Sequence, residues 1–154
     1  MFAPDLWLTQ VRCSTSTPQP SKGNIMATVD VTADTFEQTA LDNDIVLIDF
    51  WASWCGPCRT FAPIYDKVSE NHDDVVFAKV DTEAEQALAA TFNIRSIPTL
   101  MAVRDKVVVF SQPGVLPEDA LEDLITQVKE LDMEDVHKQL AEHDEHADGD
   151  HARA

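Results

Sequence analysis

The chain has 154 residues and a formal net charge of -17, and 44% of its residues are apolar. This length fits one domain with additions at its ends, and the apolar share is typical of a globular protein. A surface this acidic repels nucleic acid and anionic lipid, so we expect neither as a partner. No apolar run approaches the roughly 18 residues of a membrane-spanning helix.

The chain contains three cysteines, Cys13, Cys55 and Cys58. Three cysteines cannot all pair within one chain, and the last two lie too close in sequence to staple a fold. This excludes a secreted disulfide scaffold and favours one functional dithiol in a reducing compartment. We therefore expect a cytoplasmic protein in which Cys13 is an inert thiol.

The composition divides the chain into three parts. Residues 1–26 have no secretory signal pattern, and the stretch Ser14–Asn24 is rich in Ser, Thr, Pro and Gln, which predicts a disordered N-terminal extension with Met26 as an alternative start. Residues 27–132 carry the apolar periodicity of a folded domain. Residues 133–154 are acidic and contain histidines, which predicts a solvated C-terminal tail.

The first half of the domain reads as strand, helix, strand. Thr28–Val31 alternates weakly, as an edge strand does, and Thr32 is placed to cap a following helix. Ile45–Trp51 is almost continuously apolar, interrupted only by Asp49. This pattern predicts a strand buried on both faces of a sheet.

A helix is predicted after Cys55, because apolar residues recur there at helical spacing. Pro63 lies inside it and should kink it. The residues of the apolar stripe are Phe61, Ile64, Tyr65 and Val68.

A second buried strand is predicted over Val75–Val80. It is followed by Thr82-Glu83-Ala84-Glu85, in which Thr and Glu have the spacing of a capping box and predict a helix start. The inward face of this helix is expected to carry Ala84, Ala87, Leu88 and Thr91.

The end of the domain reads as a hairpin and a helix. The short link Arg104-Asp105-Lys106 joins Pro98–Val103 to Val107–Phe110 and predicts an antiparallel pair. Pro117 then opens a last helix, with inward-facing Leu121, Leu124, Ile125, Val128 and Leu131. The order βαβαβαββα predicts an α/β fold with a mixed central sheet and helices on both faces.

The pair Cys55-x-x-Cys58 has three interpretations: a redox dithiol, half of a zinc site, or chance. A structural zinc site needs four ligands, usually from two such pairs, and no second pair exists. The tail histidines could instead form a flexible metal-binding cluster, but a solvated acidic tail is the favoured interpretation of this segment. These histidines are His137, His143, His146 and His151. The order strand, turn, helix around the pair favours the redox dithiol.

The position of the two cysteines assigns their roles. A thiolate attacks disulfides, and the positive end of a helix dipole together with unpaired N–H groups stabilises a thiolate. Cys55 lies at the helix N-terminus and is therefore the predicted nucleophile. Cys58 lies one turn later, is expected to be less exposed, and is the predicted resolving thiol.

Residues 45–64, IVLIDFWASWCGPCRTFAPI, strongly resemble the signature of the thioredoxin family. Ala78-Lys79-Val80-Asp81, Arg95–Leu100 and Pro113-Gly114-Val115 resemble the later motifs of that family, in the same order. The resemblance runs from about Thr28 to Leu131. It implies the thioredoxin fold and a thiol–disulfide oxidoreductase that reduces disulfides in client proteins and is recharged by thioredoxin reductase.

The resemblance also implies roles beyond the cysteines. Asp49 is either a core residue in a salt bridge with Lys79 or the proton acceptor and donor for Cys58, and we favour the second role with Lys79 as its partner. Pro98 matches the cis proline that faces the dithiol in the family, where the cis bond exposes the neighbouring backbone to pair with an incoming extended peptide.

The remaining expected docking residues surround the dithiol. Trp54 is predicted to form an apolar rim for the substrate beside Cys55, whereas Trp51 lies in the buried run and is predicted to be a packing residue. The other expected docking residues are Gly56, Pro57, Ile97 and Gly114. Gly56-Pro57 between the cysteines favours a reductant. Two departures from the family pattern are Ser96, where Gly is frequent, and a hairpin turn without Gly.

Three other functions compete with a protein-disulfide reductase. An oxidant or isomerase would need an oxidising compartment. A binding module would use the surface around Trp54, Ile97 and Gly114 without redox turnover, and a metal site ranks last. We expect a monomer without a dissociable cofactor or bound metal, whose redox group is the Cys55–Cys58 disulfide.

Overall fold

The structure is a computed structural model that describes the backbone of residues 28–147 and the side chains of residues 28–143. The predictions for residues 1–26, Cys13 and His151 lie outside the described residues. The strands are β1 (Thr28–Asp30), β2 (Ile45–Trp51), β3 (Val76–Asp81), β4 (Thr99–Arg104) and β5 (Val107–Pro113). The helices are α1 (Ala33–Asp42), α2 (Gly56–Ser69), α3 (Gln86–Thr91), α4 (Glu118–Glu130) and α5 (Met133–Ala147).

The five strands form one mixed sheet in the order β1-β3-β2-β4-β5. β3 pairs in parallel with β1 and with β2, whereas β4 runs antiparallel to both β2 and β5. The predicted mixed central sheet is therefore confirmed. None of the helices within residues 28–147 is long and apolar enough to cross a membrane.

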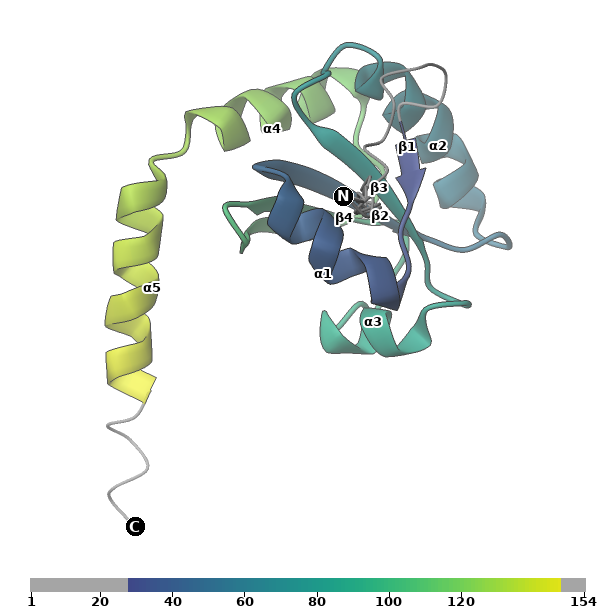
Figure 1. Cartoon of the computed structure of the whole chain (residues 1–154). Helices are drawn as coiled ribbons and strands as arrows, with labels where there is room; N and C mark the ends of the chain where they lie inside the picture. The colour runs from purple at the N-terminus through teal and green to yellow at the C-terminus, as the bar shows by residue number, and fades with distance from the viewer. Residues whose placement is uncertain (1–27, 148–154) are drawn as a thin grey trace, which may run out of the picture.

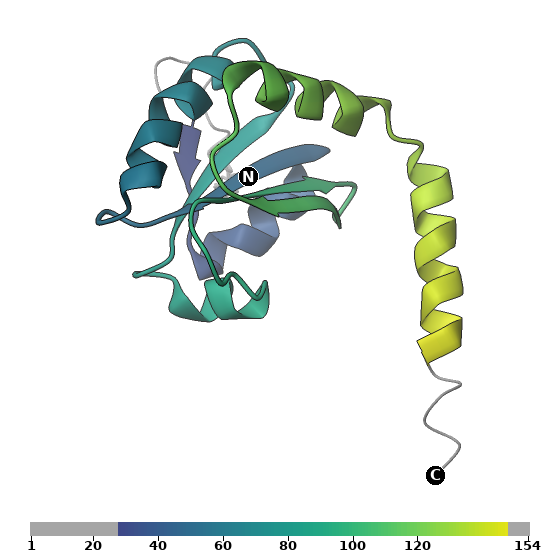
Figure 2. The ribbon, with the colours of Figure 1, turned by 180° about the vertical axis from the view of Figure 1, so that it is seen from behind.

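Strand β2 is central in the sheet and buried on both faces, as its apolar run predicted. Ile45 and Leu47 pack with helices α2 and α4, whereas Val46 and Ile48 belong to the opposite cluster, against which α1 and α3 pack. The helices consequently cover both faces of the sheet (Figures 1 and 2). Asp49 follows Leu47 by two residues, so its side chain lies on the same face of the sheet as that of Leu47, the face that α2 covers.

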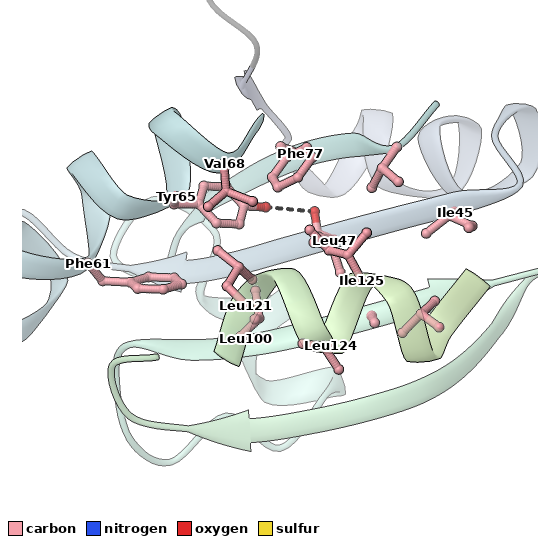
Figure 3. Close-up of a cluster of buried hydrophobic side chains, with 13 residues drawn as sticks. Ile45, Leu47, Phe61, Tyr65, Val68, Phe77, Leu100, Leu121, Leu124 and Ile125 are labelled. Atoms are coloured by element: carbon pink, nitrogen blue, oxygen red, sulfur yellow. Dashed lines mark hydrogen bonds between the residues drawn. The ribbon is translucent and has the colours of Figure 1, made fainter. Parts of the chain in front are cut away.

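Tyr65 fastens α2 to the sheet from within the larger core cluster (Figure 3). Its side chain is fully buried, and its hydroxyl lies 2.9 Å from the carbonyl oxygens of both Leu47 and Ala78. These contacts satisfy a buried hydroxyl with carbonyl groups of β2 and β3. The position of α2, at whose start Cys55 and Cys58 lie, is thereby fixed relative to the sheet.

The β4–β5 connection is the predicted tight hairpin. Asp105 and Lys106 both have positive φ values, 48° and 70°. Positive φ at both central residues is typical of the type I′ turn, whose twist matches that of the flanking strands. The hairpin therefore forms without the glycine that usually relieves this conformation.

Helix α3 begins later than the predicted capping box requires, so that prediction was wrong. The helix starts at Gln86, and the hydroxyl of Thr82 donates to the carbonyl oxygen of Trp51 instead of capping a helix. The carboxylate of Glu85 accepts a hydrogen bond from the backbone N–H of Ala33, at 3.0 Å. The side chains of Thr82 and Glu85, which the local pattern assigned to a helix cap, thus make hydrogen bonds to distant parts of the chain instead.

The buried face of α3 also differs from the prediction. Of the expected inward-facing residues only Leu88 is buried, with Ala89 beside it. The other three expected residues, Ala84, Ala87 and Thr91, are exposed.

Helix α4 follows the predicted pattern. Leu121, Leu124, Ile125 and Val128 are buried, and Leu131 is half-buried directly after the helix ends. The guanidinium of Arg104 on β4 donates to three backbone carbonyl groups at this end, those of Val128, Lys129 and Leu131. These bonds supply partners for carbonyl groups that a helix C-terminus leaves unpaired.

Helix α5 corrects the expectation of a tail from residue 133 onward. Met133–Ala147 is helical, and Oδ1 of Asp132 accepts hydrogen bonds from the N–H groups of Glu134 and Asp135. An aspartate cap and an acidic first turn both stabilise a helix N-terminus. The helix leads away from the sheet in both views (Figures 1 and 2).

Candidate active site

The two cysteines lie where α2 begins, directly beyond the end of β2. Cys55 is the N-cap residue of α2, and its Sγ accepts a hydrogen bond from the N–H of Cys58 at 3.2 Å. Pro57 occupies the first turn, where its missing N–H leaves no hydrogen bond unmade. The predicted placement of Cys55 at a helix N-terminus is therefore confirmed.

Cys55 and Cys58 form a disulfide, with their Cα atoms 5.3 Å apart. Each residue is only 3% exposed. The expectation that Cys58 is less exposed than Cys55 was wrong for this oxidised state. The disulfide holds the two sulfur atoms together, and both residues are buried to the same extent. Ala52 is buried with them, and Trp51 and Ile97 pack against this small cluster.

A second segment, distant in sequence, faces the disulfide. The Ile97–Pro98 peptide bond is cis, as the resemblance implied, and the carbonyl oxygen of Ile97 lies 3.7 Å from Sγ of Cys55. The N–H of Gly114 donates to the carbonyl oxygen of Pro98 at 2.8 Å. Gly114 has a φ of 106°, a conformation in which a side chain would be strained. The structure thus brings Ile97, Pro98 and Gly114 together beside Cys55.

Trp54 forms an exposed rim next to the buried disulfide. Its side chain is among the large apolar groups that remain exposed, at 65%. The indole Nε1 donates to Oε1 of Glu83 at 2.7 Å. Sequence reasoning missed Glu83, because the only local signal at that position was the supposed capping box.

Asp49 is a buried carboxyl group, 1% exposed, and neither of its oxygens has a hydrogen-bond partner among the described residues. Burial raises its pKa from 3.8 to about 7, because the charged form loses its hydration. The positive charge of Lys79 opposes this rise in the pKa, and the negative charge of Asp66 adds to it. A carboxyl group with a pKa near neutrality can both accept and release a proton.

Lys79 is not in the salt bridge with Asp49 that the sequence suggested. The two residues are register partners on β3 and β2, but the ammonium of Lys79 lies 3.6 Å from Oδ1 of Asp66 on α2. Lys79 therefore acts on Asp49 through its charge rather than by a hydrogen bond. Asp66 went unnoticed in the sequence, although it lies about two turns after Cys58 on the same helix.

A cavity of about 280 Å³ connects the buried carboxyl group of Asp49 with Cys58. Asp49, Lys79 and Cys58 all line it, together with Trp51, Ala52, Ser53, Arg59 and Ala62. Arg59 fixes one wall, since its guanidinium donates to the carbonyl oxygen of Ser53 at 2.8 Å. The last four of these lining residues were not predicted as site residues, although they lie within the signature segment 45–64, because their residue types carry no chemistry that marks them out.

No group of three or more metal-ligating side chains is found in the part of the chain that the structure describes. His137 and His143 lie on α5, and the side chains of His146 and His151 are outside that part. The dithiol is the group with redox chemistry at this site.

A mixed sheet with a disulfide at the first turn of a covering helix, a cis proline opposite and a buried carboxyl group behind defines the class of thiol–disulfide oxidoreductases. Comparison with known proteins gives the family. The thioredoxin family model matches residues 27–127. The chain therefore belongs to the thioredoxin family, and it is a thiol–disulfide oxidoreductase of the disulfide-reductase type.

Individual relatives agree with this assignment. The chain is 58% identical over 116 residues to putative thioredoxin 2 of Streptomyces coelicolor, covering 75% of this chain and 87% of the relative. It is 44% identical over 93 residues to thioredoxin 1 of Synechococcus elongatus, covering 59% and 87%. Among solved structures, a mutant thioredoxin from Halobacterium salinarum is similar with a TM-score of 0.64 and 37% identity, covering 71% of this chain and 99% of that one.

Proposed function

We propose that residues 27–132 act as a reductant of disulfides in client proteins, with Cys55 as the nucleophile and Cys58 as the resolving thiol. The observation that carries this proposal is the position of Cys55 at the N-cap of α2, with the N–H of Cys58 directed at its sulfur. In the reduced protein the same N–H group and the helix dipole stabilise a thiolate at Cys55.

The reaction proceeds by two exchanges. The thiolate of Cys55 attacks one sulfur of the client disulfide, forms a mixed disulfide, and releases the other client sulfur as a thiolate that takes up a proton. Cys58 then loses its proton and attacks Sγ of Cys55, which releases the second client thiolate. The client gains two electrons, and the chain is left with the Cys55–Cys58 disulfide that the structure contains.

Asp49 supplies the proton acceptor for the second exchange in this proposal. It lines the same cavity as Cys58, and its pKa of about 7 lets it take a proton from that thiol near neutral pH. Lys79 keeps the pKa of Asp49 from rising further. The role of Lys79 is to tune the acceptor through its charge.

The client chain is proposed to dock on the surface around Cys55. Trp54 supplies an exposed apolar rim, and the backbone next to Pro98 is the proposed pairing edge. This segment is held in place by the N–H of Gly114, which donates to the carbonyl oxygen of Pro98 at 2.8 Å. Backbone pairing of this kind suits an extended client peptide. Ile97 packs beside the cysteines, and Gly56 and Pro57 start the helix between the two sulfurs.

The wider setting is also a proposal. The family relationship supports thioredoxin reductase as the electron source and a monomer in the cytoplasm that carries electrons to several clients. No dissociable cofactor or metal is needed, because the reduced Cys55/Cys58 dithiol itself carries the two electrons and becomes the disulfide when it passes them on.

Insulin reduction with dithiothreitol as the electron source tests the proposal. The wild type should precipitate the insulin B chain rapidly, and the Cys55→Ser variant should fall to the background rate of dithiothreitol alone. Ser111→Ala, at an exposed position on β5 outside the cavity, is the control and should retain activity. Slow reduction that does not depend on Cys55 would refute the reductase and favour the binding module.

A further inference from the structure

The exposed ring of Trp54 is tied to a loop that has no part in the mechanism above. Its indole Nε1 donates to Oε1 of Glu83, which lies 29 residues later between β3 and α3. The ring is 65% exposed, so the hydrogen bond, rather than packing, fixes its orientation. An indole without this bond could occupy several rotamers at the rim of the site.

The loop that carries Glu83 is itself held in place. The N–H and the hydroxyl of Thr82 lie 2.9 and 3.0 Å from the carbonyl oxygen of Trp51. The N–H of Glu83 donates to Oδ1 of Asp81 at 2.9 Å. Glu85 holds the far end of the loop through its hydrogen bond with the N–H of Ala33. These contacts are the ones that replace the predicted capping box, and they give Glu83 a fixed position.

The backbone beside Trp54 is held from the opposite side. The guanidinium of Arg59 on α2 donates to the carbonyl oxygen of Ser53 at 2.8 Å. Trp54 thus has its backbone restrained from α2 and its side chain restrained from the β3–α3 loop. Because Cys55 is only 3% exposed, a client has to approach its sulfur past this rim.

We propose that Glu83 is a positioning residue that presents the indole of Trp54 in one orientation to the client polypeptide. This inference rests on the proposed function, because it concerns the docking of clients for disulfide exchange. A preordered contact residue spares the cost of immobilising that side chain on binding. Glu83 therefore affects large clients that cover the rim, and it leaves exchange with a small disulfide unchanged.

Kinetics with two substrates test the proposal. Glu83→Ala should raise KM for insulin by about 2- to 10-fold, the range that one hydrogen bond supplies, with little change in kcat. Its rate with the small neutral bis(2-hydroxyethyl) disulfide should equal that of the wild type. Glu83→Gln keeps an oxygen acceptor and should restore the KM for insulin. Glu37→Ala removes the same charge from the exposed face of α1 and is the matched control.

The indole N–H resonance of Trp54 in NMR spectra, assigned by its loss in Trp54→Phe, gives a readout independent of turnover. It should exchange with solvent faster in Glu83→Ala than in the wild type or Glu83→Gln. An unchanged KM for insulin in Glu83→Ala, or an equal rise in Glu83→Gln, would overturn the proposal. Failure of the wild type to reduce insulin would instead refute the proposed function, while the NMR comparison would still report on the hydrogen bond.

Discussion

Replacing Asp49 with Asn should stabilise the oxidised protein, by an amount that depends on pH. In the folded chain the pKa of Asp49 is about 7, against an ordinary value of 3.8. The difference of about 3 pKa units, at about 1.4 kcal/mol each, corresponds to about 4 kcal/mol. The residue is 1% exposed, so solvent screening does not reduce this figure.

The sign follows from proton binding. Between pH 3.8 and about 7 the folded chain keeps the proton on Asp49 and the unfolded chain has released it. Unfolding therefore releases a proton, and the stability of the wild type falls as the pH rises through this range. Below it the carboxyl group is neutral in both states and carries no penalty, and above it the penalty is complete.

Urea unfolding of the oxidised proteins at pH 4 and pH 8.5 measures this effect. The free energy of unfolding of Asp49→Asn should lie close to that of the wild type at pH 4 and about 4 kcal/mol above it at pH 8.5. Asp123→Asn, an exposed position on α4, should differ from the wild type by less than about 0.5 kcal/mol at both pH values. An equal difference for Asp49→Asn at the two pH values would refute the raised pKa.

Three further substitutions test the structure by urea unfolding at pH 7. Tyr65→Phe leaves two buried carbonyl groups without their hydroxyl contact and should lower the free energy of unfolding by about 1–3 kcal/mol; no loss would contradict the buried contact. Ile125→Ala empties a core position of α4 and should cost about 2–5 kcal/mol, whereas a change below about 1 kcal/mol would place α4 elsewhere. Gly114→Ala places a side chain at a φ of 106° and should cost about 1–3 kcal/mol, and a neutral result would argue against that conformation.

The sheet and the position of the dithiol could be predicted because their signals are local. The apolar run of Ile45–Trp51 can be buried only in the middle of a sheet, and the cysteines follow it at the start of an apolar helical stripe. The hairpin after Arg104 followed from its short link. In each case the residues that decide the structure lie next to one another in the chain.

The errors arose where a distant partner decides. Thr82 and Glu85 have the spacing of a cap, but Trp51 and Ala33 offered them tertiary contacts. Lys79 is the register partner of Asp49, yet its ammonium pairs with Asp66 across the helix–sheet interface. No single-sequence pattern contains the distances that decide between such partners.

Helix α5 was missed for a different reason. Its apolar positions are few, and Leu140 remains 44% exposed, so the periodicity that reveals a packed helix is weak. The signal that was present is local, the capping aspartate at residue 132 and the acidic turn after it. When helices are predicted from apolar periodicity alone, a helix that is stabilised by its cap and buries little surface is mistaken for a polar tail.

The central claim is that Cys55 attacks the client disulfide and Cys58 resolves the product. The most direct test incubates the reduced Cys58→Ser variant with a peptide that contains one disulfide, followed by intact mass spectrometry and peptide mapping. The account predicts that Cys58→Ser forms a stable adduct with the peptide through Cys55. It predicts no adduct for a second variant, Cys55→Ser, in which Cys58 is intact. A stable adduct at Cys58 in that second variant, with none at Cys55 in the first, would reverse the roles of the two cysteines and contradict the account.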